Sequence, residues 1–290
     1  MNRIENVKTT VILSIIVALL AAVAGVSGIA SDQGGETFEH ESIRGRTVTI
    51  FGKGIYRHMS EEVAVQGIAQ DYVTVFIAVP LLLLSLFFTV KGSLKWRFVF
   101  AGSAGYFLVT YLFYLTMGMY NRLFLVYAAL LGCSFFLFTL TLLSFNVRSL
   151  PAVFSEKTPV RITGGFLVFN TGCIGLLWLS IVVPPLMQGT VYPAQLEHYT
   201  TLIVQGLDLG LLLPLSAVSG LLLMGKRPFG YLLAPVYYVF LSLLMIALTA
   251  KIIGMGLIGY SIIPVIFIMP AIAFFAFLGA VILIRSLKVV

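Results

Sequence analysis

The sequence predicts an all-α, polytopic integral membrane protein with about eight transmembrane helices. Three features lead to this prediction: a shortage of charged residues, long apolar runs that recur along the chain, and similar features in the two halves. Of the 290 residues, 60% are hydrophobic and only 10% are charged. A soluble protein carries roughly a quarter of its residues as charged side chains. Water is therefore not the main solvent around this chain.

Eight apolar runs have the length of about 20 residues that a helix needs to cross a hydrocarbon core of about 30 Å. We expect spans at 9–30, 71–90, 98–118, 123–145, 162–186, 202–224, 231–253 and 260–284. The first run has a basic flank and small residues near its end, as a cleavable signal does. Its apolar core of about 19 residues is long enough to span, so we expect it to be retained.

The distribution of lysine and arginine predicts the orientation in a cell membrane. With the N-terminus inside, 12 of the 18 basic residues lie on the cytoplasmic side, and every short inside loop is basic. Both termini are then cytoplasmic, and the long loop 31–70 is extracytoplasmic. The net charge of +7 is explained by loops that face anionic lipid headgroups. We expect the bilayer as a partner and no nucleic acid, because the chain lacks a clustered basic face with exposed aromatics.

The two halves carry similar features in the same order. The first half reads GKGIY (52–56), VQG (65–67), Asp71, Pro80 and GM (118–119), and the second reads QGTVY (188–192), VQG (204–206), Asp208, Pro214 and GM (254–255). We infer two four-helix membrane repeats, 1–145 with the loop 31–70 and 146–290. Because each repeat has an even number of spans, the repeats are parallel and related by a pseudo-two-fold axis along the membrane normal.

Each VQG stretch is followed by an aspartate at the lip of an apolar run. Asp71 is stabilised there by a helix N-terminus. Asp208 lies deeper among leucines, where a bare carboxylate is costly and needs a partner. We expect Lys251 to pair with Asp208, and Arg122 to face Asp71. Structural ion pairs and a ligand site are both open interpretations of these residues.

Prolines within spans kink helices, so Pro80 and Pro214 can flare an outward-facing cavity below the two aspartates. Two tyrosines deeper in the membrane, Tyr106 and Tyr114, need acceptors for their hydroxyls. The candidate ligand-binding residues are Asp71, Asp208, Gln66, Gln205, Tyr56, Tyr192, Lys251 and Arg122.

The loop 31–70 contains one predicted hairpin, at 46–56. Residues 47–50 alternate in polarity, and Gly52-Lys53-Gly54 has the composition of a turn. Ser60 is a candidate N-cap for a helix that runs into the second span.

His58, Glu61 and His198 form a weak candidate metal site, against the alternative that the histidines are simply solvated or interfacial. The phosphate-cradling patterns GxxxxGK[ST] and GxGxxG do not occur in the sequence, and we expect no cofactor.

Three functions fit these features. The first is binding or transport of a small or lipid-like solute through an outward-facing cavity. The second is a non-catalytic subunit or scaffold that docks another membrane protein through the loop 31–70. The third is a membrane-embedded enzyme in which Asp71, Asp208, His58 and His198 supply acid–base or metal chemistry. The sequence favours the first and leaves open whether the protein is an enzyme.

Overall fold

The computed structural model of the chain describes residues 7–288. Within these residues, eight helical segments are long and apolar enough to cross a membrane. They are α1 (Val7–Ala30), α2–η1–α3 (Glu61–Val73, Thr74–Ala78, Val79–Val90), α4 (Leu94–Met117), α5 (Phe124–Leu143), α7 (Val160–Met187), α8–η4–α9 (Ile203–Leu207, Asp208–Leu212, Leu213–Met224), α10 (Pro228–Leu257) and α11 (Val265–Arg285). Each predicted apolar run corresponds to one segment. The number of spans is therefore confirmed by length and composition.

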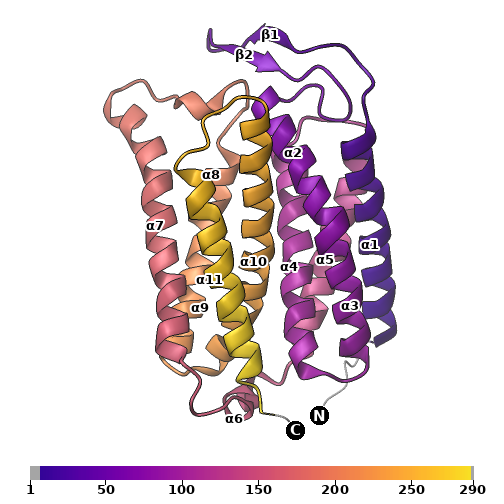
Figure 1. Cartoon of the computed structure of the whole chain (residues 1–290), viewed down its shortest axis with the longest axis vertical. Helices are drawn as coiled ribbons and strands as arrows, with labels where there is room; N and C mark the ends of the chain where they lie inside the picture. The colour runs from indigo at the N-terminus through magenta and orange to yellow at the C-terminus, as the bar shows by residue number, and fades with distance from the viewer. Residues whose placement is uncertain (1–6, 289–290) are drawn as a thin grey trace.

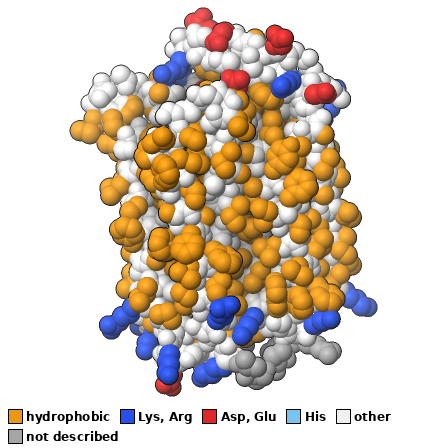
Figure 2. Space-filling view, in the orientation of Figure 1, with side chains coloured by type: hydrophobic (Ala, Val, Ile, Leu, Met, Phe, Trp, Pro, Cys, Tyr) orange, Lys and Arg blue, Asp and Glu red, His pale blue; other side chains and the backbone are white. Residues whose placement is uncertain are grey.

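The segments stand side by side as a bundle with the β-strands at one end (Figure 1). We call this the hairpin end; it carries β1 (Phe38–Glu41) and β2 (Thr47–Ile50). At the opposite, terminal end, α1 begins and α11 ends. Lysine and arginine side chains gather at the terminal end, acidic side chains gather at the hairpin end, and apolar side chains cover the surface between them (Figure 2). A broad apolar belt between two polar ends is typical of membrane proteins.

The core lies where α4 and α10 pack against each other. In their most apolar stretches, 67% and 72% of the residues are buried, against 11% in α7 and 17% in α11. Gly102 of α4 permits this close approach, because a Cβ there would lie 2.8 Å from the carbonyl oxygen of Val236 in α10. The other segments surround this central pair and leave α7 and α11 largely exposed to lipid.

The predicted hairpin has the correct second strand but the wrong partner. Thr47–Ile50 forms β2, which pairs antiparallel with the upstream strand β1, with Phe38 opposite Ile50. The chain reverses before β2, where Gly45 has φ +74° and donates its N–H to the Ser42 carbonyl at 2.8 Å. The expected turn at Gly52–Gly54 instead ends β2 and leads toward α2.

The second and sixth membrane segments share a distortion. Each contains a five-residue π-helical turn, η1 or η4, that ends two residues before Pro80 or Pro214. Proline lacks an N–H and its ring clashes with the carbonyl four residues earlier, so a wider turn accommodates it. The boundaries that follow also correspond: 208 against 74, 224 against 90 and 228 against 94, a constant separation of 134 residues.

Candidate functional site

Asp71 lies on α2, inside the bundle, with 2% of its surface exposed. Its carboxylate accepts hydrogen bonds from the hydroxyls of Tyr56 at 2.6 Å and Tyr114 at 2.9 Å. Tyr56 belongs to the loop that precedes α2, whereas Tyr114 belongs to α4. Burial of a carboxyl group is costly unless its oxygens are hydrogen-bonded, and two tyrosines meet this requirement. The loop, α2 and α4 are thereby joined at one buried group.

Two glycines leave the room that this arrangement needs. A Cβ on Gly28 of α1 would overlap the Asp71 carboxylate and lie 3.0 Å from the Tyr56 hydroxyl. A Cβ on Gly67 would lie 3.1 Å from the Tyr56 ring. The Gly67 carbonyl also lies 3.1 Å from the Tyr114 hydroxyl that contacts Asp71. The glycine of the first VQG stretch therefore permits the close approach of Tyr56, because a Cβ there would force the ring to shift.

The polar network continues from Asp71 along α2. The side-chain amide of Gln70 donates to the Tyr106 hydroxyl at 2.6 Å and to Thr110 Oγ1 at 3.3 Å. The Thr74 hydroxyl donates to the Gln70 carbonyl at 2.9 Å. Gln70 and Thr74 were not among the predicted site residues, although Gln66, Gln70 and Thr74 recur at the four-residue spacing of one helix face.

Asp208 is partly buried and accepts a hydrogen bond from Trp178 Nε1 of α7 at 2.8 Å. The expected ion pair with Lys251 is absent: among the described residues, the Lys251 ammonium has no hydrogen bond or ion pair. Asp208 and Asp71 nevertheless both act on Lys251 electrostatically. This lysine of α10 thus lies within electrostatic reach of one carboxylate from each half of the chain.

The expected contact between Asp71 and Arg122 is wrong. The side chain of Arg122 is exposed in the loop before α5. The oxygens of Asp71 are already occupied by Tyr56 and Tyr114. Neutral hydrogen-bond donors for a buried carboxylate were not expected from the sequence.

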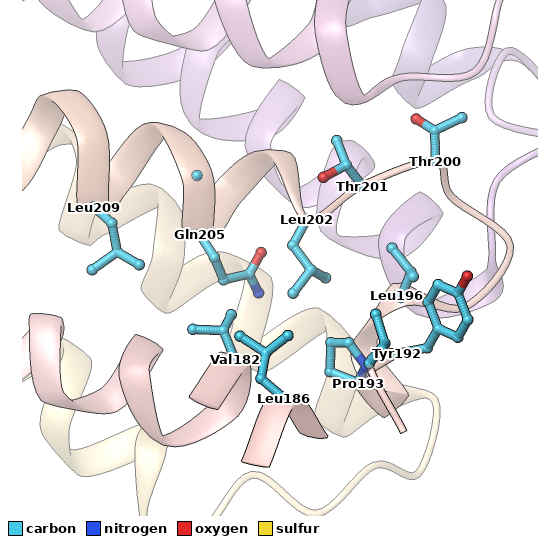
Figure 3. A pocket seen from close by; sticks show the side chains of 12 residues that line it. Val182, Leu186, Tyr192, Pro193, Leu196, Thr200, Thr201, Leu202, Gln205 and Leu209 are labelled. Carbon is cyan, nitrogen blue, oxygen red and sulfur yellow. The ribbon is translucent and has the colours of Figure 1, made fainter. Parts of the chain in front are cut away.

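A pocket of about 370 Å³ lies between the end of α7, the loop 191–202 and α8. Its lining is mostly apolar and includes Val182, Leu186, Leu202 and Leu209, with Gln205, Thr200, Thr201 and Tyr192 as the polar side chains. Gln205 extends from α8 toward Val182 of α7 (Figure 3). The pocket therefore offers apolar walls together with an amide and hydroxyl groups.

The two VQG stretches have different surroundings. Gln66 donates to Glu62 Oε1 at 3.2 Å and lies 3.3 Å from Met255 Sδ, whereas Gln205 lines the pocket. A Cβ on Gly206 would have no neighbour within 4 Å, in contrast to the crowded Gly67. The reason is register: Gln66 precedes its proline by 14 residues and Gln205 by nine. The same three letters therefore stand at different positions relative to the π-turn.

The two tyrosines that the sequence analysis paired also differ. Tyr56 is buried, with 5% of its surface exposed, against 59% for Tyr192. The ring of Tyr192 lies beneath the guanidinium of Arg44, 5.5 Å from the ring centre. Tyr192 belongs to the pocket, and Tyr56 belongs to the Asp71 cluster.

The predicted metal site is wrong for the part of the chain that the structure describes. No group of three or more histidine, cysteine, aspartate or glutamate side chains there is arranged to hold a metal ion. His198 Nε2 lies 3.2 Å from the backbone oxygen of His58, whose own side chain is exposed. Because α2 begins at Glu61, His58 precedes the helix and does not share a helical face with Glu61.

Eight apolar helices, a polar cluster inside them and a pocket near one end define the class of this protein: it fits a helical, multi-pass membrane protein. Comparison with protein-family models, with curated proteins and with solved structures finds no match to the chain.

Proposed function

We propose that the protein binds a lipid-like or other amphipathic molecule in the pocket beside Gln205. The observation that carries this proposal is the contrast between the two VQG stretches. In the first, Tyr56 fills the space beside Gly67; in the second, the space beside Gly206 is open and continues into the pocket. A volume of about 370 Å³ lies within the range of small-molecule sites, which spans roughly 300–1,000 Å³.

The chemistry of the lining supports an amphipathic ligand. Leu186, Leu202 and Leu209 offer apolar contact, while Gln205 and the hydroxyls of Thr200 and Thr201 offer hydrogen bonds. α7 is the least buried span, and 62% of the Leu186 surface is exposed. A ligand already dissolved in the bilayer can therefore reach the pocket along α7 without passing through water.

The proposal includes an orientation in a cell membrane with both ends of the chain in the cytoplasm. The basic terminal end then faces the cytoplasm and the acidic hairpin end faces outward, as the positive-inside rule favours. The pocket lies at the level of the loop 191–202, so it opens outward.

We further propose that the chain arose as two parallel four-helix units, 1–145 and 146–290. The constant separation of 134 residues from the π-turns to the starts of α4 and α10 supports this interpretation. In this view the halves have diverged in function. Tyr56 and Asp71 fill interior space in the first half, whereas the second half keeps an open pocket.

Photolabelling tests the binding proposal. The full-length protein in nanodiscs is labelled with a diazirine fatty acid, and the modified peptides are mapped by mass spectrometry. We expect labelling of 182–209, reduced several-fold in Gly206→Leu, which fills the open space. Gly132→Leu on α5 is the matched control, since a Cβ there also meets nothing within 4 Å. Equal labelling of 182–209 in both variants would contradict the proposal.

Docking of another membrane protein through the loop 31–70 is the second candidate function. All four residues of β1 are exposed, and β2 is its only strand partner within the described residues. A partner strand can extend a sheet at such an edge. Glu39→Pro removes one outward-facing backbone donor from this edge, because in the antiparallel register Ser42 and His40 direct their N–H groups toward β2. Loss of an interchain crosslink at β1 with unchanged photolabelling of 182–209 would favour docking over ligand binding.

A further inference from the structure

A second pocket, of about 270 Å³, lies at the hairpin end and differs in chemistry from the first. Three glutamates from two separate segments line it: Glu61 and Glu62 at the start of α2, and Glu197 in the loop between α7 and α8. Arg46 is the one basic residue in the lining, and its side chain is exposed. This acidic pocket therefore carries an excess of negative charge.

The position of Glu197 is fixed by the hairpin. Arg44, in the turn between β1 and β2, donates hydrogen bonds to the backbone oxygens of Glu197 at 2.9 Å and Tyr199 at 2.6 Å. The Tyr199 hydroxyl in turn accepts the Ser60 N–H at 3.2 Å. These contacts hold the loop of the second half against the start of α2, so the acidic pocket is assembled from both halves.

Two polar atoms of the residues that line the acidic pocket lack well-formed hydrogen bonds within the described residues. Ser60 lines the acidic pocket with 1% of its surface exposed; its Oγ lies beside the Tyr199 hydroxyl but makes no hydrogen bond of good geometry within the described residues. Oε2 of Glu197 is likewise buried and without a partner there. Buried polar atoms in folded proteins are nearly always hydrogen-bonded, so an acceptor and a hydroxyl of two residues in one pocket lining require an explanation.

The charges of the acidic pocket also act on one another and on the tyrosine at its edge. Glu62 and Glu197 repel each other electrostatically. Burial raises the pKa of Tyr260, and the negative charges of Glu62, Glu61 and Glu197 raise it further. The three carboxylates therefore all lie within electrostatic reach of Tyr260. A cation placed there would relieve their repulsion.

We propose that the acidic pocket binds an organic cation through a guanidinium group. The carboxylates are not grouped closely enough to hold a metal ion, so the ligand must span the distances between them. A guanidinium offers five N–H donors in a planar fork that suits carboxylate acceptors. Tyr260 adds an aromatic side chain to the lining, and aromatic faces attract such cations.

Isothermal titration of the full-length protein in nanodiscs with agmatine tests this proposal. We expect saturable binding, weakened more than tenfold in Glu197→Gln and in Glu62→Gln. Glu41→Gln on exposed β1 is the matched control and retains wild-type affinity. The neutral analogue, with urea and alcohol groups in place of guanidinium and amine, should not bind. Thermal melting of each variant shows whether it is folded before its affinity is compared.

The outcomes separate the sources of the guanidinium. Tighter binding of an arginine-containing tripeptide amide than of agmatine identifies a protein side chain as the ligand, and the reverse identifies a free small cation. Absence of binding to the wild type, equal binding of the neutral analogue, or unchanged affinity in both folded pocket variants would overturn the proposal. Photolabelling of the pocket beside Gln205 is a separate readout, so the two proposals can fail independently.

Discussion

The hydroxyl of Tyr56 donates a hydrogen bond to Asp71 Oδ2 at 2.6 Å, deep in the first half of the bundle. This contact fastens the loop after β2 to the second membrane segment. Gly28 and Gly67 lie against the pair, and a Cβ on either glycine would crowd it. The region around Gly206 in the second half has no such filling side chain, and Gly206 lines a pocket.

Replacement of Tyr56 by phenylalanine should destabilise the protein. The variant keeps the ring but leaves one oxygen of buried Asp71 without its donor, which costs about 1–3 kcal/mol. The free energy of unfolding, measured in detergent micelles by denaturant titration, checks this. Tyr120→Phe is the control, because 78% of the Tyr120 surface is exposed. Equal stability of the two variants would show that the Tyr56 hydrogen bond contributes nothing measurable.

Substitution of Gly28 by alanine should displace α1. The added methyl group meets the Asp71 carboxylate, and overpacking of this kind costs about 1–3 kcal/mol. Gly132→Ala on α5 introduces the same methyl group with nothing within 4 Å. There we expect a neutral or slightly stabilising effect, because alanine favours the helix. Thermal midpoints of the two variants give the comparison, and a Gly28 variant as stable as the Gly132 variant would refute the close packing.

Asp208 and Lys251 should be energetically coupled although they do not form a direct ion pair. A double-mutant cycle with Asp208→Asn and Lys251→Gln should give an interaction energy of about 1 kcal/mol, because each charge acts on the other inside the bundle. The asparagine oxygen can still accept from Trp178, so the cycle isolates the charge. A cycle with exposed Asp32 in place of Asp208 should be additive. Additivity in both cycles would disprove the coupling.

The hairpin end should lose stability as the pH falls below about 6.5. Burial is the main cause that lowers the pKa of His198 below its usual 6.5. The contact with the His58 carbonyl and the charge of Glu197 oppose this effect, while His40 and Arg44 add to it. The folded state therefore binds fewer protons than the unfolded state. The stability that this pKa shift contributes is complete at pH values above the pKa of His198 in the unfolded state. It is lost as the pH falls toward the pKa of His198 in the folded state.

Hydrogen exchange of residues 194–201 between pH 7.5 and pH 5.5, corrected for the intrinsic rate, measures this loss. In His198→Gln, the corrected exchange rate of residues 194–201 should depend much less on pH. His58→Gln keeps the backbone acceptor that His198 contacts and serves as the matched variant. A pH response that persists unchanged in His198→Gln would assign the titration to another group.

The membrane segments were predictable because the bilayer selects for local properties. A run of apolar residues of sufficient length identifies a span without knowledge of its neighbours. Seven of the eight segments begin within five residues of the predicted position. The exception is the second, which begins at Glu61 instead of 71. Its first turns carry Glu61, Glu62, Gln66 and Gln70, which are too polar to be read as part of an apolar run.

The polar contacts were not predictable, because they depend on which helix faces lie together. Asp71 was expected to face Arg122, but it is paired with Tyr56 and Tyr114, 15 and 43 residues away in the chain. The repeated VQG stretches suggested equivalent sites, but the number of residues between each stretch and its proline differs. The two stretches therefore occupy different positions relative to the π-helical turn. Sequence alone does not rank such alternatives when every candidate is polar and near an interface.

By itself, the sequence determined the class of the protein, the number of its spans and the strand at 47–50, because apolar length and alternating polarity are properties of the local chain. Only the tertiary structure decided that Tyr56 closes the first half while Gly206 leaves the second open. It also decided that glutamates from two distant segments share one pocket. These features arise from the packing of side chains between helices. A residue one helical turn further along can line a pocket instead of contacting a neighbouring side chain.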